Sequence, residues 1–399
     1  MPRRPIEILH LAFSHYPADT RVKREAQALL ATGRRVAVIA LRHAGERPVE
    51  RCAGVIAVRM PGTKTRGGFL RYLFDYLVFI WRCRWLISHH RRLARLLVVH
   101  VHTLPDFLLW AALPARRRGG RIVLDMHEIF PEFARSKFGG PLGRVLEVAA
   151  RAIERGARRR ADLTITVNRP IDELLDTRTI GRRERRLIVH NTADPADFGN
   201  EAPPPSNWVS GDRPLQLVYH GTLTHLYGLD IAIRGVAEAR GLGIPVVLSI
   251  IGDGPDRADL IALTDRLGMH EVVRFELPLP QAALPARLAQ CDVGLVPTRL
   301  NAMTRYSLSN KLLEYVHLGL PVLAARLPSY NHYFNEDSIW YWTPHDAGDL
   351  ARAIADFASS SSTERRTRAN RARSALSELV WPRERERLLA AYKDLIRDA

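Results

Sequence analysis

The segment SLSNKLLEYVHLGLPVLAA (307–325) combines a helix start with two charged side chains. Ser309 or Asn310 is a good helix cap, so Lys311 and Glu314 would lie three residues apart on one face near the helix start. A cation beside the free N–H groups of a helix start suits a diphosphate. A carboxylate one turn further on can hold the vicinal hydroxyls of a sugar. An exposed Lys–Glu ion pair is the alternative interpretation of the same spacing.

Two glycine-rich turns follow apolar runs in the same half of the chain. In YHGTLTHLYGLDIAI (219–233) we expect a strand to end at His220, with Gly221 and Thr222 in the turn before a helix. Glycine lets backbone N–H groups approach an anion because no side chain stands in the way. Gly252, in IGDGP (251–255), is a weaker second candidate. Either turn is also compatible with a plain strand-to-helix connection that binds no ligand.

The elements that must position these residues follow from the apolar runs. IEILHLAF, RRVAVIAL, LLVVHVHT, RIVLDMHE and DLTITVN alternate with helical patterns and are rich in Val, Ile and Leu on both faces. Such runs are typical of parallel strands covered by helices. After the Pro-rich segment EAPPPSN (201–207) the pattern restarts with LQLVYHG, VVLSIIG, VVRFEL, VGLVPT and PVLAA. The sequence therefore predicts two doubly wound α/β domains, joined near residue 205, whose strand ends face each other across a cleft.

Charge is divided unevenly between the two halves of the 399-residue chain. Residues 1–200 hold 37 Lys and Arg against 19 Asp and Glu, whereas residues 201–399 hold 22 against 23. The overall composition, 46% hydrophobic and 25% charged, excludes a disordered or fibrous protein. Three widely spaced cysteines form neither a metal-binding spacing nor a disulfide framework, so a reducing cytosol is expected. No stretch approaches the roughly 20 apolar residues of a membrane span.

The basic N-terminal half predicts peripheral attachment to an anionic membrane surface. FLRYLFDYLVFIWRCRWLISHHRRLARL (69–96) mixes Trp, Phe and Leu with Arg and His, as does a helix that lies among lipid headgroups. Arginine clusters at 116–118, 158–160 and 182–186 would each add attraction, roughly 1 kcal/mol per residue near the surface. No nucleic-acid motif accompanies them, so nucleic acid is not an expected partner. We expect a cytoplasmic protein held at the inner face of the cell membrane.

Taken in order, these segments resemble the retaining, GT-B-type nucleotide-sugar glycosyltransferases of family four, which include many bacterial cell-envelope and exopolysaccharide transferases. The resemblance covers nearly the whole chain and rests on PADTRVKREAQALLATGRRV, VLDMHEIFPE (123–132), HGTL, IGDGP, LAQCDVGLVPT, NKLLEY…GLPV and WPRERERLLAAY. It implies two Rossmann-like domains. Residues 1–203 would form the acceptor side, residues 204–381 would bind the activated sugar, and a helix in 382–399 would cross back to the first domain.

The resemblance also carries roles to individual residues. Glu314 matches the family glutamate that binds the nucleotide ribose, and His127 matches a histidine near the transferred sugar. Asp19 and Arg21 match an Asp-x-Arg on the loop after the first strand, which with Glu128 would lie on the acceptor side. The alternatives are a core histidine at 127, and a helix-capping Asp19 followed by a solvated Arg21.

The chain departs from the family pattern where the diphosphate should bind. Tyr306 stands in the place of a second glutamate, and Thr222 and Tyr227 stand where Arg and Lys are common. A nucleoside diphosphate leaves as a multiply charged anion, so some other group must stabilise it. Lys311 is the best substitute and Arg305 the next.

The resemblance implies transfer of a sugar from a UDP- or GDP-sugar to an acceptor hydroxyl with retention of configuration. His127 and Lys311 are the expected catalytic side chains, and the further donor contacts are Gly221, Thr222, Gly252, Arg305, Ser309, Asn310 and Glu314. No Asp-x-Asp motif is present, so no metal or other cofactor is expected. A lipid-linked acceptor in glycolipid or polysaccharide assembly would explain why the acceptor-side domain alone is basic. A nucleotide-sugar 2-epimerase-like enzyme and a non-catalytic nucleotide-sugar binding protein on the same fold are the alternatives.

Overall fold

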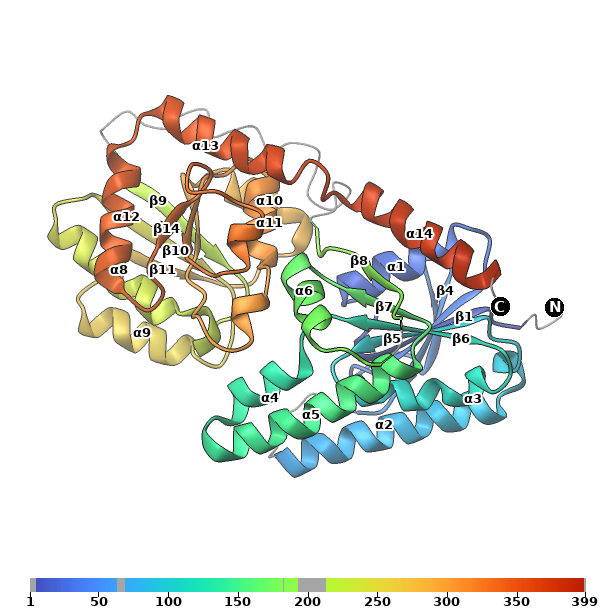
Figure 1. Cartoon of the computed structure of the whole chain (residues 1–399). Coiled ribbons are helices and arrows are strands. Elements are labelled where there is room, and N and C mark those ends of the chain that lie inside the picture. Colours follow the sequence, from blue (N-terminus) through green and yellow to red (C-terminus); the bar gives the residue numbers. More distant parts are fainter. Residues whose placement is uncertain (1–4, 63–68, 182, 193–212, 398–399) are drawn as a thin grey trace. The chain divides into compact units, whose positions relative to one another are not determined.

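The structure is a computed structural model that describes residues 5–62, 69–181, 183–192 and 213–397. The chain divides into two compact units, one formed by residues 1–191 with 384–399 and the other by residues 192–383. The expected domain boundary at residues 203 and 204 lies outside the described residues. In Figure 1 each unit is a sheet with helices on both of its faces. The predicted fold class, two parallel-sheet α/β domains, is confirmed.

The first unit is built on an eight-stranded sheet in the order β3-β4-β2-β1-β5-β6-β7-β8. Its strands pair in parallel, except for the antiparallel edge pair β3 and β4. Its elements are β1 Ile8–His15, α1 Thr20–Leu30, β2 Val36–Leu41, β3 Val49–Cys52, β4 Val55–Met60, α2 Phe69–His89, η1 Arg91–Leu93, β5 Val98–Thr103, η2 Asp106–Ala112, α3 Leu113–Arg116, β6 Arg121–Met126, α4 Phe130–Phe138, α5 Gly140–Arg160, β7 Leu163–Thr166, α6 Arg169–Thr177 and β8 Arg186–Ile188.

The second unit holds a six-stranded, all-parallel sheet in the order β11-β10-β9-β12-β13-β14. Its elements are β9 Leu215–His220, η3 His225–Tyr227, α8 Leu229–Gly241, β10 Val246–Ile251, α9 Arg257–Arg266, β11 Val273–Glu276, η4 Gln281–Ala283, α10 Leu284–Leu288, β12 Val293–Val296, η5 Thr304–Tyr306, α11 Asn310–His317, β13 Val322–Ala325, η6 Tyr330–His332, β14 Trp340–Trp342, α12 Ala347–Ser359 and α13 Ser362–Ala375.

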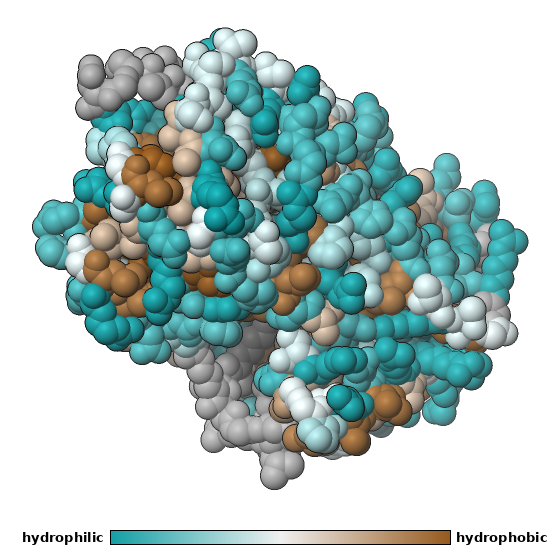
Figure 2. Space-filling model, turned by 60° about the vertical axis from the view of Figure 1, so that its left-hand side comes forward, coloured by the Kyte–Doolittle hydropathy of each residue, from teal (hydrophilic) through white to brown (hydrophobic). Residues whose placement is uncertain are grey.

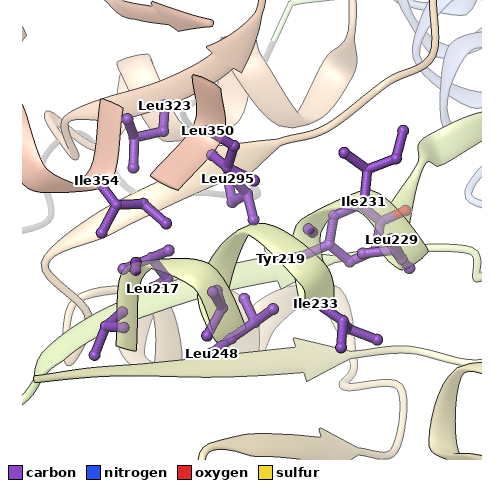
Figure 3. Packing of buried hydrophobic residues seen from close by; sticks show 14 of the residues in the cluster. Leu217, Tyr219, Leu229, Ile231, Ile233, Leu248, Leu295, Leu323, Leu350 and Ile354 are labelled. Carbon is purple, nitrogen blue, oxygen red and sulfur yellow. The ribbon is translucent and has the colours of Figure 1, made fainter. Parts of the chain in front are cut away.

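The core of the second unit lies where α8 and α12 cover one face of its sheet (Figure 3). Leu217 and Leu248 from neighbouring strands pack there with Leu350 of α12, and all three are fully buried. A Cβ at Gly235 of α8 would lie 2.7 Å from Cδ2 of Leu350, so a glycine is needed for the two helices to approach this closely. This close packing fixes the strands, and their carboxyl ends carry the predicted donor residues.

The last helix, α14 (Trp381–Arg397), is tied to the first unit by buried polar contacts. Oε1 of Glu384 lies 3.0 Å from Nδ1 of His190, and the hydroxyl of Tyr392 lies 2.6 Å from Nδ1 of His100. Residues from 384 onward accordingly belong to the first unit. Among the described residues, no helix has both the length and the apolar character that crossing a bilayer requires.

Candidate active site

The two glycine turns form one surface at the carboxyl ends of β9 and β10. Gly221 has a φ of +121° and Gly252 a φ of +151°, backbone conformations that favour glycine. The N–H of Gly221 donates to the carbonyl of Ile251 at 2.9 Å, and a Cβ on Gly252 would collide with the carbonyl oxygen of Gly221. Thr222 is exposed beside them. The two turns therefore pack backbone against backbone. They lie at the carboxyl ends of the strands, where parallel α/β domains bind ligands.

Lys311 is the cation that the fold brings to this surface. A Cβ on Gly221 would lie 2.6 Å from Cε of Lys311 and 3.1 Å from its Nζ, so glycine leaves the room that this side chain fills. Its ammonium group lies 3.8 Å from the ring centroid of Tyr227 and 5.3 Å from that of Tyr219. Burial lowers the pKa of Lys311 to about 8, although the charge of Glu314 acts in the opposite direction. Tyr227, one of the departures from the family pattern, thus helps to hold the substitute cation.

Glu314 lies three residues after Lys311 in α11 and faces a histidine that sequence reasoning assigned no role. Its Oε2 is 3.1 Å from Nε2 of His220, the last residue of β9. The hydroxyl of Tyr315 accepts a hydrogen bond from the N–H of His220 at 3.2 Å and lies 3.2 Å from the carbonyl oxygen of Val218. Tyr315 thereby ties α11 to β9. The position of His220 directly before the glycine turn was the signal in the sequence that could have identified it. Its pairing with Glu314 could not be predicted, because it depends on the packing of α11 against β9.

The remaining predicted donor residues surround the start of α11. Ser309 occupies the N-cap position but makes no capping hydrogen bond through its side chain, and Asn310 is the exposed first residue of the helix. Arg305 is exposed on η5, with its guanidinium 5.6 Å from the ring centroid of Tyr306. Of the two predicted substitute cations, Lys311 is the one placed against the glycine turn.

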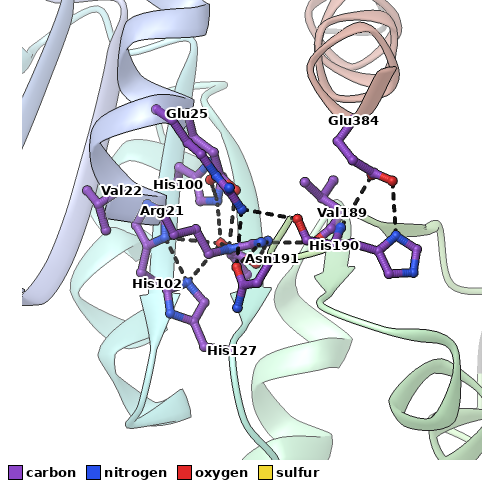
Figure 4. Close-up of polar contacts among 12 residues, drawn as sticks. Arg21, Val22, Glu25, His100, His102, His127, Val189, His190, Asn191 and Glu384 are labelled. Atoms are coloured by element: carbon purple, nitrogen blue, oxygen red, sulfur yellow. Dashed lines mark hydrogen bonds and ion pairs between the residues drawn. The ribbon is translucent and has the colours of Figure 1, made fainter. Parts of the chain in front are cut away.

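In the first unit a buried aspartate organises the predicted histidine (Figure 4). Nε2 of His127 lies 2.9 Å from Oδ2 of Asp125, and Nδ1 of His102 lies 3.1 Å from the same oxygen. Burial lowers the pKa of His127, but the charge and hydrogen bond of Asp125 outweigh it, so this pKa lies above its ordinary value. The His127 side chain is 21% exposed and can reach a ligand. The arrangement favours the protonated form of His127, which donates hydrogen bonds.

Arg21 overturns both expectations for its position, because it is neither on a loop nor solvated. It lies in α1 and is buried, with Nε and Nη2 donating to the two oxygens of Asp125 at 2.8 and 2.7 Å. It also pairs with Glu25 at 3.2 Å. A buried guanidinium needs such carboxylate partners. Burial raises the pKa of Asp125, but Arg21 and the neighbouring histidines together outweigh that effect and hold it well below the ordinary value. Arg21 therefore positions the aspartate that holds His127, and it is not an acceptor contact.

Asp19 caps α1, as the alternative interpretation predicted. Its Oδ1 accepts a hydrogen bond from the N–H of Val22 at 3.3 Å. Burial raises the pKa of Asp19, but the neighbouring His127 and His102 outweigh this, and the pKa lies below its ordinary value. Asp19 thus lies close enough to these histidines to interact with their charge. Glu128 follows His127 directly and is half-buried, and its acceptor role stays a prediction.

A stack of histidines beneath His127 was missed from the sequence. His10 and His100 are register partners on β1 and β5, and their ring centroids lie 4.8 Å apart. Within the described residues, ligand atoms close enough for a metal ion occur in two buried groups, His10 with His100 and His102, and Glu25 with His100, His102 and Asp125. Arg21 already pairs with both carboxylates of the second group, so we assign no metal there. That the reaction needs no metal stays a prediction.

Comparisons with known proteins decide the family. Residues 18–192 match the glycosyl transferase 4-like domain, and residues 205–374 match the glycosyl transferases group 1 domain. The chain is a GT4-type glycosyltransferase. Both the family resemblance and the enzyme class that the sequence predicted are confirmed.

This glycosyltransferase has curated relatives that match it only in part. Over 118 residues, 29% of this chain, it is 35% identical to the GDP-mannose-dependent alpha-(1-6)-phosphatidylinositol monomannoside mannosyltransferase of Mycolicibacterium smegmatis. That match covers 31% of the relative, and matches to the other curated relatives cover 36–66% of theirs.

Solved structures show the GT-B fold over almost the whole glycosyltransferase. Sucrose-phosphate synthase from Thermosynechococcus elongatus aligns with a TM-score of 0.80 at 16% identity, over 99% of this chain and 100% of that one. Anabaena HepE in complex with UDP-glucose aligns with a TM-score of 0.71 at 16% identity, over 98% and 100% of the two chains. At these identities the likeness concerns the fold alone.

Proposed function

We propose that this glycosyltransferase moves a sugar from a UDP- or GDP-sugar to an acceptor hydroxyl with retention of configuration. The observation that carries the proposal is the placement of Lys311 against the Gly221 turn, with Glu314 three residues further along the same helix. The cation and the turn backbone match the diphosphate of such a donor, and the carboxylate matches its ribose. All three lie at the carboxyl ends of the strands. The names of the two relatives above, one GDP-mannose-dependent and one bound to UDP-glucose, are consistent with this donor class.

In this proposal the second unit stabilises the leaving group. Lys311 neutralises part of the diphosphate charge that develops as the glycosidic bond breaks, and N–H groups near Gly221, Thr222 and the start of α11 add to it. The carboxylate of Glu314 accepts hydrogen bonds from two ribose hydroxyls, and His220 orients that carboxylate. The mechanism thus depends on a preorganised cation rather than on a protein nucleophile.

The first unit would act on the transferred sugar. A protonated His127, held by Asp125, donates a hydrogen bond to a sugar hydroxyl or to the reacting oxygen. The leaving phosphate itself accepts the proton of the acceptor hydroxyl. The acceptor oxygen then attacks the sugar from the face that the phosphate leaves, so the configuration is retained. The work of the protein is then positioning and charge stabilisation.

For the acceptor we propose a lipid-linked molecule at the cytoplasmic face of the cell membrane, in glycolipid or polysaccharide assembly. On α2, Phe74, Leu77, Trp81 and Trp85 are 52–66% exposed and recur at intervals of three or four residues, so they form one face of the helix. On the face of the molecule shown in Figure 2, hydrophilic residues predominate and hydrophobic ones form separate patches. The exposed apolar face of α2 suits partial burial among lipid headgroups.

The arginine clusters contribute less to this attachment than the sequence suggested. Arg158 is buried and paired with Glu154 at 3.3 Å and Glu184 at 2.6 Å, so its charge is neutralised inside the unit. Arg118 donates to the carbonyl oxygens of Ile87 and Ser88, whose helix it secures. Position 182 lies outside the described residues. Apolar insertion by α2 therefore supports the attachment better than a count of basic residues does.

A panel of nucleotide sugars tests the donor assignment. Thermal unfolding should shift upward with one UDP- or GDP-sugar, because a ligand that binds only the folded protein stabilises it by about 2.7 kcal/mol at a concentration of 100 Kd. Glu314→Ala should remove most of that shift, since charge-assisted hydrogen bonds are worth about 1.5–3 kcal/mol each. Equal shifts in wild type and variant would contradict the role of Glu314 in donor binding.

A further inference from the structure

The first unit contains an apolar cavity that the transfer chemistry does not use. It has a volume of about 170 Å³ and lies among α2, α4, α5 and the segment around Pro105. Figure 1 shows these three helices lying side by side along one face of the first unit. From this cavity we infer a binding site for part of one hydrocarbon chain of the lipid-linked acceptor, an inference that rests on the proposed function.

The lining of the cavity fits a hydrocarbon chain and little else. Apart from Tyr76 and Lys137, every described side chain that lines it is apolar. Phe107 contributes to an aromatic wall, with its ring centroid 6.1 Å from that of Tyr76 and 6.0 Å from that of Phe130. A space lined almost entirely by apolar groups holds water poorly and takes up apolar ligands. A sugar or a nucleotide would lose its hydrogen bonds there.

Exposed apolar residues stand next to the cavity lining on the same helices. Leu73 lines it one residue before the exposed Phe74 of α2. On α5, Leu146 and Ala149 line it and directly follow Val145 and Val148, which are 65% and 69% exposed. A lipid chain that leaves a bilayer at this face would find exposed apolar residues next to the cavity lining. This proximity favours a membrane lipid over a free metabolite.

A cation in the cavity lining indicates the headgroup chemistry. Nζ of Lys137 lies 5.4 Å from the ring centroid of Phe133 and 5.9 Å from that of Phe138, at the end of α4. An ammonium group beside an apolar chain site suits the phosphate that links a lipid to its polar head. The site therefore fits an anionic lipid that places part of one chain in the cavity and its phosphate near Lys137.

Two matched variants on α5 test this site. Ala149 and Ala152 are both exposed on this helix, but Ala149 lines the cavity and Ala152 does not. The probe is cis-parinaric acid, a long-chain fatty acid whose fluorescence rises in apolar surroundings. We expect saturable binding to the full-length protein, weakened at least about tenfold by Ala149→Trp because the indole occupies the chain's space, and unchanged by Ala152→Trp. Equal binding by both variants would overturn the inference.

Photolabelling of the wild-type protein gives a readout that needs no variant. A fatty acid with a diazirine at its methyl end should label residues of α4 and α5 that line the cavity, such as Phe133 and Leu146. Labelling confined to the exposed α2 residues Trp81 and Trp85 would mean surface adsorption only, and would overturn the site.

Sugar transfer separates this inference from the proposed function. With extracted membrane lipid as acceptor, Ala149→Trp should lower transfer at least about tenfold and leave the thermal shift caused by the donor unchanged. Unchanged transfer together with lost parinaric acid binding would overturn the acceptor assignment but leave the proposed function intact. Parinaric acid binding by a protein that breaks down no nucleotide sugar would instead contradict the proposed function.

Discussion

The pKa values of Lys311 and His127 are shifted in opposite directions by their surroundings. Burial against two tyrosines lowers the pKa of Lys311 to about 8. Burial also lowers the pKa of His127, but Asp125 outweighs it and raises that pKa above its ordinary value. Each group binds an anion or donates a hydrogen bond better when protonated. Both roles therefore weaken as the pH rises.

The first prediction concerns Lys311. Affinity for the nucleoside diphosphate should fall as the pH rises through about 8, because the lysine loses its charge there. Lys311→Met should lower turnover by on the order of 100-fold and remove that pH dependence of binding, which calorimetry between pH 7 and 9 measures. Arg305→Ala is the comparison. It should lower turnover less than Lys311→Met and keep the pH dependence, because Arg305 does not lie against the glycine turn. Equal, small effects of both variants would mean that backbone N–H groups carry the diphosphate charge.

The second prediction concerns His127. His127→Ala should remove sugar transfer but keep the affinity for the bare nucleoside diphosphate, since the diphosphate is assigned to Lys311 and the turns of the second unit. Thermal shift with UDP or GDP measures the binding, and donor breakdown measures the activity. Parallel loss of binding and activity would assign His127 to nucleotide binding.

The sequence predicted which individual residues matter better than it predicted what surrounds each of them. Lys311 was chosen because the usual cations are missing, and the structure places it beside Gly221. Arg21 was misplaced because its burial depends on β6 presenting Asp125 to α1, a contact between residues far apart in the chain. His220 was missed for the same reason, since its partner Glu314 belongs to a later helix.

Among the elements, α2 stands out because it is apolar on two faces. Tyr76, Phe79, Cys83 and Ile87 are buried, whereas Phe74, Leu77, Trp81 and Trp85 are exposed, and both sets recur at helical spacing. One set packs on the first unit. Against the described residues, the second set stays 52–66% exposed. That excess of apolar surface is the structural basis for the proposed membrane attachment.

The third prediction follows from this element. The double change Trp81→Ser and Trp85→Ser should abolish cosedimentation with liposomes that contain anionic lipid, because it removes the two indoles that would insert among the headgroups. Leu242→Ser and Leu277→Ser, at residues of the second unit that are 64% and 71% exposed, form the control pair and should bind as wild type does. Undiminished sedimentation of the tryptophan variant would point to a soluble acceptor.

Element positions were predictable where apolar periodicity was strong. The strand runs ending at Thr103 and His220 occur as expected, because Val- and Ile-rich runs between helices favour buried parallel strands. The basic segment 69–96 is not one helix. Helix α2 ends at His89, and the side chain of His90 then caps the short η1 by accepting a hydrogen bond from the N–H of Arg92.

At the scale of the whole chain, part of the N-terminal surplus of positive charge is neutralised inside the first unit. Arg21 pairs with Asp125, and Arg178 pairs with Glu154. Composition alone gave no means to separate such internal pairs from surface charge. The two-domain organisation was predictable because the strand–helix pattern restarts after a Pro-rich segment.

The central claim, that this glycosyltransferase uses a nucleotide sugar with retention, is tested most directly by product analysis. The purified protein would be incubated with the donor found by thermal shift and with extracted bacterial membrane lipid, and the products followed by phosphorus and proton NMR. We predict release of the nucleoside diphosphate, with the sugar in the lipid fraction in the anomeric configuration of the donor. An inverted linkage, an epimerised donor or a donor that is bound but never consumed would contradict the account.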